Sequence, residues 1–452
     1  MSLSSLDRTF TADRPLAPAN ENAISNPQAT DYGYEFWGKA ENLARITAWP
    51  LAVVLVFHRV LFTALNGTLT DDFSTVFDAI RRFLNGHAVY EQAYQNVDPL
   101  YLYNPGATLL LSPLGFISDF ETARTGFIAL NALAIILALG FLTKLVGQSL
   151  AGWVWPASIA AAFMTEAVIN TLAFSNINGV LLLALSFFLW AFCRGHQPRD
   201  GAVSGAETSD STDADGEVGI QAARGWLWLA GLVLGLAIVI KPQFAPLLFL
   251  AVAKLDWRTF LSGVSVPIAL NVAAWPLLAD SGDYLNKLVP YLSTTRDYAN
   301  SSWAGLQAYF GIPASIYYAV WVLFAFITAA GILVLLRWRH TDPILWSVTT
   351  SGLIMVGIFF LSSLGQQYYS MWLFPVMFTA ALARSVFHSW TAWLAAVLFL
   401  IPNSWESWRW PDIGRWMDTY LGTLGWALLI IATTATAWGW LASQRKGVES
   451  QA

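Results

Sequence analysis

Apolar stretches alternate with short polar segments along most of this 452-residue chain. The first, 46–65, has the length that an α-helix needs to cross a bilayer, roughly 20 residues at about 1.5 Å each. The pattern predicts an all-α, polytopic integral membrane protein with about 12 transmembrane helices. The candidate spans are 46–65, 105–118, 124–146, 151–171, 177–194, 225–240, 243–254, 258–278, 314–337, 342–362, 367–384, 389–402 and 421–442.

Basic residues between the spans predict the orientation, because Lys and Arg are enriched on the cytoplasmic side of a membrane. They occur at Arg8, Arg14, Lys39 and Arg45, at Arg194, Arg199 and Arg224, at Lys254 and Arg258, at Arg337 and Arg339, at Arg384, and at Arg445 and Lys446. Both termini are therefore expected in the cytoplasm, which requires an even number of crossings. The candidates are odd in number, so we expect a short one beside a proline, 105–118 or 243–254, to dip into the membrane at a cavity.

The polar segments outline one membrane domain, 45–442, of the kind just described. Residues 1–44 are expected to be a disordered cytoplasmic tail, and residues 443–452 a second cytoplasmic tail. Residues 195–224 are rich in Gly, Ser, Thr, Asp and Glu, which predicts a flexible cytoplasmic loop. The first external segment is 66–104.

That external segment contains a short amphipathic helix, TDDFSTVFDAIRRFLNG. Thr70 is expected to cap it, Asp71 and Asp72 lie in its first turn, and Gly86 follows its end. Its apolar stripe is typical of a helix on the membrane surface; the stripe is Phe73, Val76, Phe77, Ile80 and Phe83. The two aspartates either stabilise the positive end of the helix or include a general base that deprotonates a hydroxyl.

The composition supports the membrane assignment and excludes several functions. Only 12% of the residues are charged, about half of what a soluble domain carries. The chain has no basic block that would indicate nucleic acid. Its single cysteine, Cys193, excludes an intramolecular disulfide. The five histidines show no metal-ligand spacing, so no metal site is predicted.

Two basic residues are candidates for binding a phosphate. Lys241, in VIKPQF, ends a strongly apolar helix and either snorkels to lipid headgroups or binds a lipid-linked phosphate. Arg296, in STTRDYANSS, either pairs with Asp297 or lies at the same site.

Three polar clusters on the external side could bind sugar hydroxyls and ring faces, although each of these residues alone could equally be a helix cap or part of an aromatic belt. VDPLYLYNPG contributes Asp98, Tyr101, Tyr103 and Asn104. SNING contributes Asn176 and Asn178, and LGQQYYS contributes Gln366, Gln367, Tyr368 and Tyr369. Their common side favours a shared site.

With these motifs the chain resembles the C superfamily of glycosyltransferases (GT-C), polytopic enzymes that use polyprenyl-phosphate sugars. Within it, the chain resembles the DUF2029-type actinobacterial enzymes, which include mannosyltransferases, and most of all the arabinofuranosyltransferases that introduce α-1,3 branches into cell-wall arabinan. The resemblance covers about 45–445. The strings that carry it are TDDF, VDPLYLYNPGATLL, SNINGVLLL, TRDYANSS and QQYYSMWLFPV.

The resemblance implies a general base at Asp71 or Asp72, with Asp72 favoured because it precedes a large apolar residue. It implies donor-phosphate binding by the Lys241–Pro242 pair. Many relatives have Gln where this chain has Asn176 and Asn178, which leaves the role of this motif open. The resemblance does not assign Arg296, whose candidacy comes from its charge and its side.

We therefore expect inverting transfer of arabinofuranose from decaprenyl-phosphoryl-β-D-arabinofuranose to arabinan of arabinogalactan or lipoarabinomannan, on the outer, periplasmic face of the plasma membrane. The expected partners are this donor, a polysaccharide or lipoglycan acceptor and membrane lipids, and no nucleic acid. No cofactor is required, although a divalent cation at the aspartate pair is compatible with the pattern. The alternatives are a polyprenyl-phosphomannose-dependent mannosyltransferase, a lipid or sugar transporter or flippase, and a non-catalytic scaffold.

Overall fold

The computed structural model describes residues 27–66, 72–94, 100–196, 213–401, 405 and 407–449, and all regular structure in these ranges is helical. Eight helices in this part are long and apolar enough to cross a membrane, or nine if one bent pair forms a single span. The prediction of an all-α, polytopic membrane protein is confirmed. The long helices are fewer than the expected number, about 12, because several apolar runs are broken into short pieces.

The long elements account for eight of the apolar runs. They are α1 (Pro27–Phe57) with its π-helical continuation η2 (His58–Leu65), α4 (Phe120–Leu145), α7 (Asn178–Gly195), α8 (Asp213–Ile240), α10 (Trp257–Ala274), α13 (Ala314–Leu335), α14 (Pro343–Leu361) and α17 (Pro411–Glu449). Two of them, α1 and α10, continue through an internal proline, Pro50 and Pro267.

Five candidate spans are interrupted. Prolines and capping residues end each helix early; at Thr165, for example, the side chain caps α6 and the chain bends by 68°. The pieces are α3 (Pro105–Leu111) with η3 (Ser112–Phe116), α5 (Val154–Met164) with α6 (Glu166–Ala173), η4 (Pro242–Leu247) with α9 (Leu248–Lys254), η8 (Gln367–Leu373) with α15 (Phe374–Phe378) and η9 (Thr379–Ala381), and α16 (Trp390–Leu400). The two segments expected to dip, 105–118 and 243–254, are both among them.

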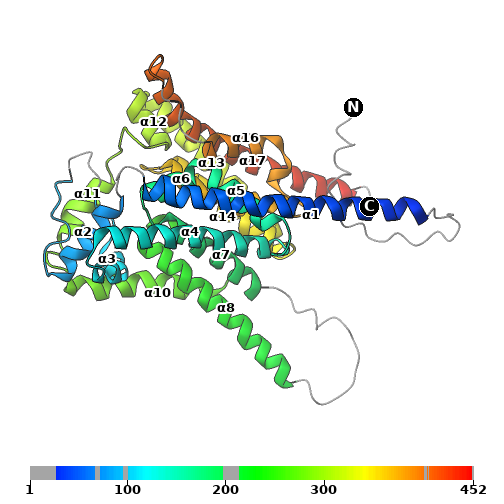
Figure 1. Ribbon diagram of the computed structural model, residues 1–452, viewed down its shortest axis with the longest axis horizontal. Coiled ribbons are helices and arrows are strands. Elements are labelled where there is room, and N and C mark those ends of the chain that lie inside the picture. Colours follow the sequence, from blue (N-terminus) through cyan, green and yellow to red (C-terminus); the bar gives the residue numbers. More distant parts are fainter. Residues whose placement is uncertain are drawn as a thin grey trace.

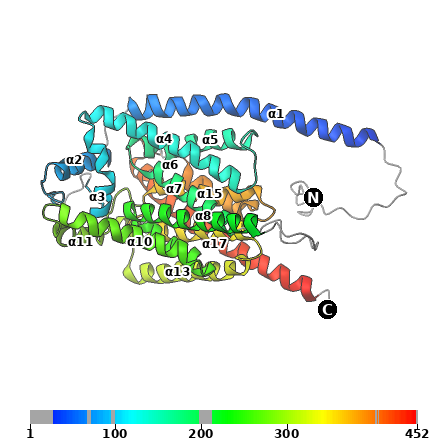
Figure 2. The same cartoon turned by 90° about the horizontal axis from the view of Figure 1, so that it is seen from below.

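The long helices lie roughly side by side and define two ends of the molecule (Figures 1 and 2). One end carries α2 (Asp72–Leu84), α3 and α11 (Val289–Leu292). We call this the α2 end. Parts of α1, α8 and α17 extend beyond the bundle at the opposite end. The remaining short elements are η5 (Trp275–Leu277), η6 (Tyr284–Leu288), α12 (Trp303–Phe310), η7 (Leu336–Trp338) and η10 (Val386–His388).

Three helices are longer than the sequence predicted. The first begins at Pro27, so part of the tail expected to be disordered is helical. The helix α8 begins at Asp213, inside the expected flexible loop, and α17 continues to Glu449, inside the expected C-terminal tail. Extending a helix that already exists adds one hydrogen bond for each residue that is fixed. The polar residues next to these apolar spans can therefore continue the helix. The rest of both tails and residues 197–212 lie outside the described residues.

The amphipathic helix forms where it was predicted, but its apolar stripe faces protein instead of lipid. The Phe73 ring lies 4.9 Å from the ring of Phe127 and 5.7 Å from that of Phe120, centroid to centroid. Val76 and Ile80 are buried in a separate small core with Tyr90 and Tyr101. The expectation that the stripe faces the membrane is wrong, because α4 and the chain after α3 cover it. Gly86 follows the helix with a φ of +73°, as its position predicted.

Glycines bring α8 and α10 together. A Cβ atom at Gly235 would lie 2.7 Å from Val266 Cβ, and one at Gly263 would lie 3.5 Å from Gly231 O. Gly231 and Gly235 have the small-xxx-small spacing that lets membrane helices approach closely. Their packing fixes the end of α8, where Lys241 begins the next segment.

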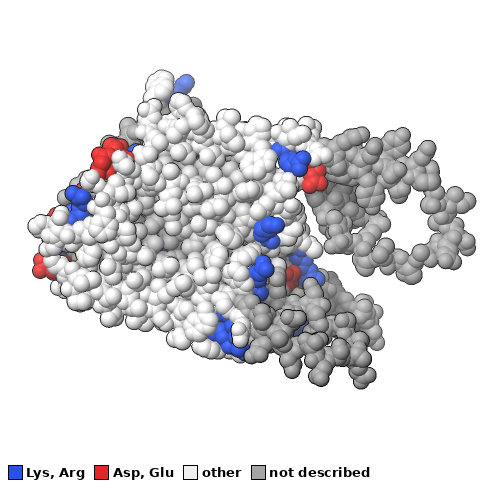
Figure 3. Space-filling view, turned by 60° about the horizontal axis from the view of Figure 1, so that its bottom comes forward, with Lys and Arg blue, Asp and Glu red and all other residues white. Residues whose placement is uncertain are grey.

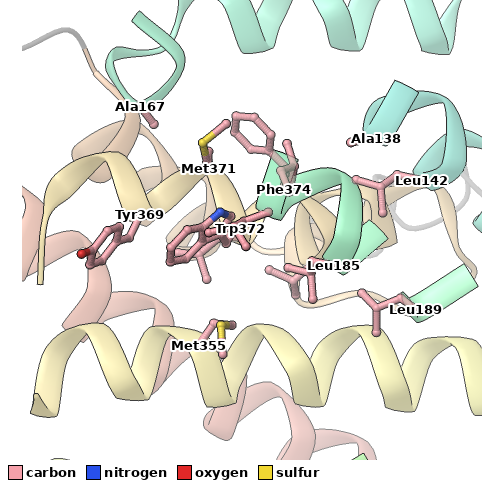
Figure 4. Close-up of a cluster of buried hydrophobic side chains, with 14 of the residues drawn as sticks. Ala138, Leu142, Ala167, Leu185, Leu189, Met355, Tyr369, Met371, Trp372 and Phe374 are labelled. Atoms are coloured by element: carbon pink, nitrogen blue, oxygen red, sulfur yellow. The ribbon is translucent and has the colours of Figure 1, made fainter. Parts of the chain in front are cut away.

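The main core lies between the long helices and the broken segment that follows Gly365. Figure 4 shows Trp372 of η8 between Met371, on the side of Ala167 of α6, and Met355 of α14, with Leu185 of α7 beside it. The Tyr369 and Trp372 rings are stacked, with centroids 4.8 Å apart and an 11° interplanar angle. This broken segment therefore supplies aromatic side chains to the interior of the bundle.

Candidate active site

Asp72 is the first residue of α2 and is partly buried among polar side chains from distant parts of the chain. The Tyr368 hydroxyl donates to Asp72 Oδ2 at 3.5 Å. Burial raises the pKa of the Asp72 carboxyl, and the charge of Lys241, the nearby polar groups of Asn176 and Tyr368, and the charge of Arg296 oppose that rise. Asp72 is thus a carboxylate with reduced hydration and a raised proton affinity, as a general base requires.

Lys241 follows α8 directly, where Pro242 ends the helix. Its ammonium nitrogen lies 4.2 Å from the centre of the Tyr369 ring, 5.3 Å from that of Trp372 and 5.7 Å from that of Tyr368. These contacts turn it toward the interior of the protein and away from lipid headgroups. Lys241 and Asp72 are both described, and no ion pair within 4 Å joins them. The acid and the ammonium therefore face one site without neutralising each other in direct contact.

Asn176 reaches Asp72 from an unusual turn at the end of α6. The backbone N–H of Ser175 donates to Leu172 O at 3.1 Å and that of Asn176 to Thr171 O at 3.1 Å, which closes a Schellman motif. Ser175 occupies the left-handed position of this motif with a φ of +52°, where glycine is usual. The strained turn holds Asn176, which is 5% exposed, against the carboxyl group.

Arg296 contributes a second positive charge. Its guanidinium lies 5.7 Å from the centre of the Tyr291 ring and 5.8 Å from that of Tyr298. It forms no ion pair with Asp297, although both residues are described. The charge of Arg296 lowers the pKa of Asp72, so the guanidinium lies within electrostatic reach of the acid.

Asn300 holds the Arg296 segment in place, a role that the sequence did not indicate. Its side-chain N–H groups donate to Arg296 O at 3.1 Å and to Ser363 O at 2.9 Å. Its side-chain oxygen accepts from Gly365 N at 2.9 Å and from Ser302 N at 3.1 Å. One buried amide therefore ties the Arg296 loop to the turn that leads to Gln366 and Tyr368.

Comparison with known proteins agrees with this arrangement. The sequence model of glycosyltransferase family 87 matches residues 101–363, which include Asn176, Lys241 and Arg296. The chain belongs to this family. It is 47% identical over 400 residues to an α-(1→3)-arabinofuranosyltransferase of Corynebacterium glutamicum, covering 88% of each chain. Enzymes of the same name from Mycolicibacterium smegmatis and Mycobacterium tuberculosis are 36% and 37% identical, over 86% of this chain and 84% of theirs.

Family 87 membership makes this chain a multi-pass membrane glycosyltransferase, and the resemblance inferred from the motifs is confirmed. The family match does not include Asp72 or Tyr368, which lie on either side of it in sequence. The fold brings both of them to the matched residues. The site of this family 87 protein therefore combines the start of α2, the α6–α7 turn, the α8–η4 junction and the segment after α14.

Several residues predicted for sugar binding occupy this site and others do not. Tyr103 lies near Asp72 and Tyr369, and the side-chain oxygen of Gln366 contacts the Tyr368 hydroxyl. Tyr101 instead is fully buried in the small core under α2, where its hydroxyl contacts Thr108 Oγ1 at 2.7 Å. Its predicted role in sugar binding is not supported by its position.

Three amides have other positions than expected. The side-chain oxygen of Asn104 accepts from Ala107 N at 2.9 Å as the N-cap of α3, and its side-chain nitrogen donates to Val239 O at 2.6 Å. Gln367 packs near Gly422 of α17. Asn178 is fully buried at the start of α7, where its backbone oxygen accepts from Trp372. Asn104 is thus structural in this family 87 fold, and Asp71 and Asp98 lie outside the described residues.

The structure adds one polar residue that the sequence did not single out as a candidate. Gln243 lies close to Tyr369, beside Lys241. Its place in the string VIKPQF, two residues after the lysine, was the available signal. Within the described residues no three His, Cys, Asp or Glu side chains are grouped to hold a metal ion.

An apolar groove of about 610 Å³ lies beside the broken segment that follows Lys241. Its walls are Pro246 and Phe249 on one side and residues of α13 and α14 on the other, from Thr328 to Leu361. Ser362, which follows α14 and also lines the groove, directly precedes the turn held by Asn300. The groove therefore runs from Ser362 along the C-terminal half of α14, as far as Ile354.

Proposed function

We propose that this family 87 glycosyltransferase transfers arabinofuranose from decaprenyl-phosphoryl-β-D-arabinofuranose to an arabinan hydroxyl, forming an α-1,3 branch. The curated relatives named α-(1→3)-arabinofuranosyltransferase support the sugar and the linkage. The α2 end faces the outside of the plasma membrane, and both termini lie in the cytoplasm. The acceptor is arabinogalactan or lipoarabinomannan, and the enzyme requires no cofactor.

The observation that carries this proposal is that Asp72, a partly buried acid, lies near Lys241 and Arg296 without forming an ion pair with either of these described residues. Asp72 removes the proton from the acceptor hydroxyl while the oxygen of that hydroxyl attacks the anomeric carbon of the donor. The bond between that carbon and the phosphate oxygen breaks, and decaprenyl phosphate leaves with the electron pair. Lys241 and Arg296 stabilise the charge on the departing phosphate, since fixed cations act strongly where water is partly excluded. Attack opposite the leaving group converts the β-linked donor into an α-linked product.

The remaining polar groups orient the sugar. Asn176 and Tyr368 hold the Asp72 carboxyl, and Tyr103, Gln243 and Gln366 are available to the sugar hydroxyls. Aromatic faces such as that of Tyr369 suit the apolar face of a furanose ring. The apolar groove accommodates the start of the prenyl chain, since it is lined by apolar side chains and includes Pro246 of η4, the element that directly follows Lys241.

Asn substitution tests the base directly. In membranes supplied with lipid-linked arabinose and an arabinan acceptor, Asp72→Asn should reduce transfer by about 10²–10⁴-fold, the usual contribution of general acid–base catalysis. Asp78→Asn is the matched control, because Asp78 is exposed on the same helix. Full activity of Asp72→Asn would reject Asp72 as the base. Preferential use of lipid-linked mannose would favour the mannosyltransferase alternative, and movement of the donor without release of polyprenyl phosphate would favour a transporter.

Cysteine labelling tests the orientation. The native Cys193 is buried, so a membrane-impermeant thiol reagent reports mainly on cysteines that are introduced. Asp78→Cys should react in intact cells and Arg337→Cys should react only after lysis, since α13 and α14 separate these exposed positions across the membrane. The reverse result would place the α2 end in the cytoplasm.

A further inference from the structure

The end of the bundle opposite Asp72 carries a second, smaller pocket of about 230 Å³. It lies where two helix connections meet, one between α9 and α10 and the other between α13 and α14. The pocket contains Lys254, Arg339 and His340, with Phe249 and Leu336 as apolar walls. The 19 residues of α14 separate it from the turn that leads to Tyr368, so it faces the other leaflet.

The two cations of this pocket lack acidic partners among the described residues. Lys254 makes a contact with the Trp346 ring at 5.8 Å and no ion pair within 4 Å. Arg339 Nε donates to His340 Nε2 at 3.0 Å, and no other side-chain bond of Arg339 occurs in the described part. An anion can therefore bind both cations without first displacing a carboxylate.

The two nearest carboxylates are engaged in helix capping. Asp256 Oδ1 accepts from Arg258 N at 3.2 Å at the start of α10. Asp342 Oδ1 accepts from Leu345 N at 3.1 Å at the start of α14. Neither carboxylate forms an ion pair within 4 Å with Lys254 or Arg339 in the described part of the chain.

The surroundings of the pocket favour a lipid over a free anion. Phe249 lines both this pocket and the large apolar groove, so a chain attached to a bound headgroup has an apolar path along α9. Leu255, at the rim, is 88% exposed, which is expected of a side chain that contacts acyl chains. In the view of Figure 3, Lys and Arg side chains gather toward this end, and the broad flank between the two ends carries almost no charge.

We propose that Lys254, Arg339 and His340 form a binding site for the phosphate headgroup of an anionic phospholipid in the leaflet opposite Asp72. The acyl chain lies along Leu336 and Phe249, and Phe249 also lines the large apolar groove. Charge complementarity identifies the headgroup, and the continuous apolar wall identifies the chain. This proposal does not depend on the sugar or on the donor.

Native mass spectrometry of the full chain in detergent tests the site. The protein is titrated with dioleoyl phosphatidylglycerol and, separately, with dioleoyl phosphatidylcholine, which has the same chains. We expect one phosphatidylglycerol to bind at least tenfold more tightly than phosphatidylcholine. Lys254→Gln with Arg339→Gln should weaken that binding about 30-fold, since each cation near a headgroup contributes roughly fivefold. Arg337→Gln, an exposed cation in the same connection, should leave it unchanged.

Two further measurements protect the test from misinterpretation. The variant with Lys254→Arg and Arg339→Lys keeps both charges and should bind phosphatidylglycerol nearly as the native protein does. If it loses binding as fully as the glutamine variant does, charge does not determine the site and the proposal is wrong. Equal binding of the two phospholipids, or displacement of phosphatidylglycerol by inorganic phosphate at equal concentration, would also overturn it.

Discussion

Two tyrosine-rich regions lie close to α2, and they differ in what their polar groups contact. The first, which we call the aromatic–cation cluster, is Lys241, Tyr368, Tyr369 and Trp372. The second, the tyrosine core, is Tyr90, Tyr94 and Tyr101. In the tyrosine core, Tyr90 donates to Tyr103 O at 3.0 Å and Tyr94 to Tyr101 O at 3.0 Å.

The cations beside these regions differ as well. Lys287 donates to Tyr90 O at 3.4 Å and forms an ion pair with Asp283 at 2.7 Å. Lys241 faces aromatic rings and makes no such pair, although Asp72 is near. Tyrosines whose hydroxyls bind the backbone, next to a neutralised cation, stabilise a fold. Tyrosines that face a cation and an acid that are not in direct contact form a site. What the tyrosine hydroxyls and the neighbouring lysine contact therefore distinguishes the two regions, whereas their composition does not.

The largest expected effect distinguishes the two lysines. Lys241→Met should reduce sugar transfer by about 10²–10³-fold, the usual loss when a fixed group that stabilises transition-state charge is removed. Lys287→Met should change transfer less than twofold, because an exposed ion pair contributes little. Initial rates with both variants at equal protein amounts in membranes measure the difference. Similar losses in the two would remove the distinction between the regions.

The second prediction compares two hydroxyl deletions. Tyr368→Phe should lower the transfer rate about fivefold with little change in stability, because the hydrogen bond to Asp72 is lost at a charged group. Tyr101→Phe should leave the rate unchanged and lower the free energy of unfolding by about 1 kcal/mol, because it breaks the buried contact with Thr108. Rates and thermal denaturation in detergent are measured for both. Loss of rate in Tyr101→Phe would assign a site role to the tyrosine core.

The third prediction concerns pH. The ionised form of Asp72 is the active base, so kcat/KM should fall as pH decreases through its pKa, which burial raises above 3.8. Arg296→Gln removes a charge that lowers this pKa, so its acidic limb should shift to higher pH. The matched control is Arg337→Gln, at the opposite end, whose limb should coincide with that of the native protein. A shift of the Arg296→Gln limb to lower pH would contradict the assignment.

The smallest effect concerns the strained turn beside the aromatic–cation cluster. Ser175→Gly should raise the free energy of unfolding by about 0.5–1 kcal/mol, because glycine adopts positive φ without a steric penalty. Transfer should stay within about twofold, since the two Schellman hydrogen bonds that position Asn176 remain. Asp280→Gly, at a φ of +52° outside the site, is the control for the stability gain. A larger loss of activity in Ser175→Gly alone would show that the serine side chain itself has a role.

Charge and apolar length were the parts of this molecule that the sequence predicted well. Lys241, Arg296 and Asp72 were selected from three distant strings, and the structure brings them to one end of the bundle. Local strings alone cannot decide whether an amide caps a helix or faces a ligand. Asn104 and Asn176 look alike in sequence, yet one caps α3 and the other contacts the acid.

The number of crossing helices was harder to predict. An apolar run such as 367–384 satisfies the length criterion for a span, but it folds into short turns whose side chains fill the interior. Hydropathy records only that these residues avoid water. It does not distinguish a helix surrounded by lipid from a broken segment surrounded by protein.

The close crossing of α8 and α10 has a consequence for how the enzyme could acquire new substrates. Gly235 lies six residues before Lys241, about 9 Å along the helix axis. A methyl group added there would collide with Val266 and tilt the helix, carrying the ammonium with it. A Gly235→Ala substitution can thus shift the position of the Lys241 ammonium without changing any residue of the site itself.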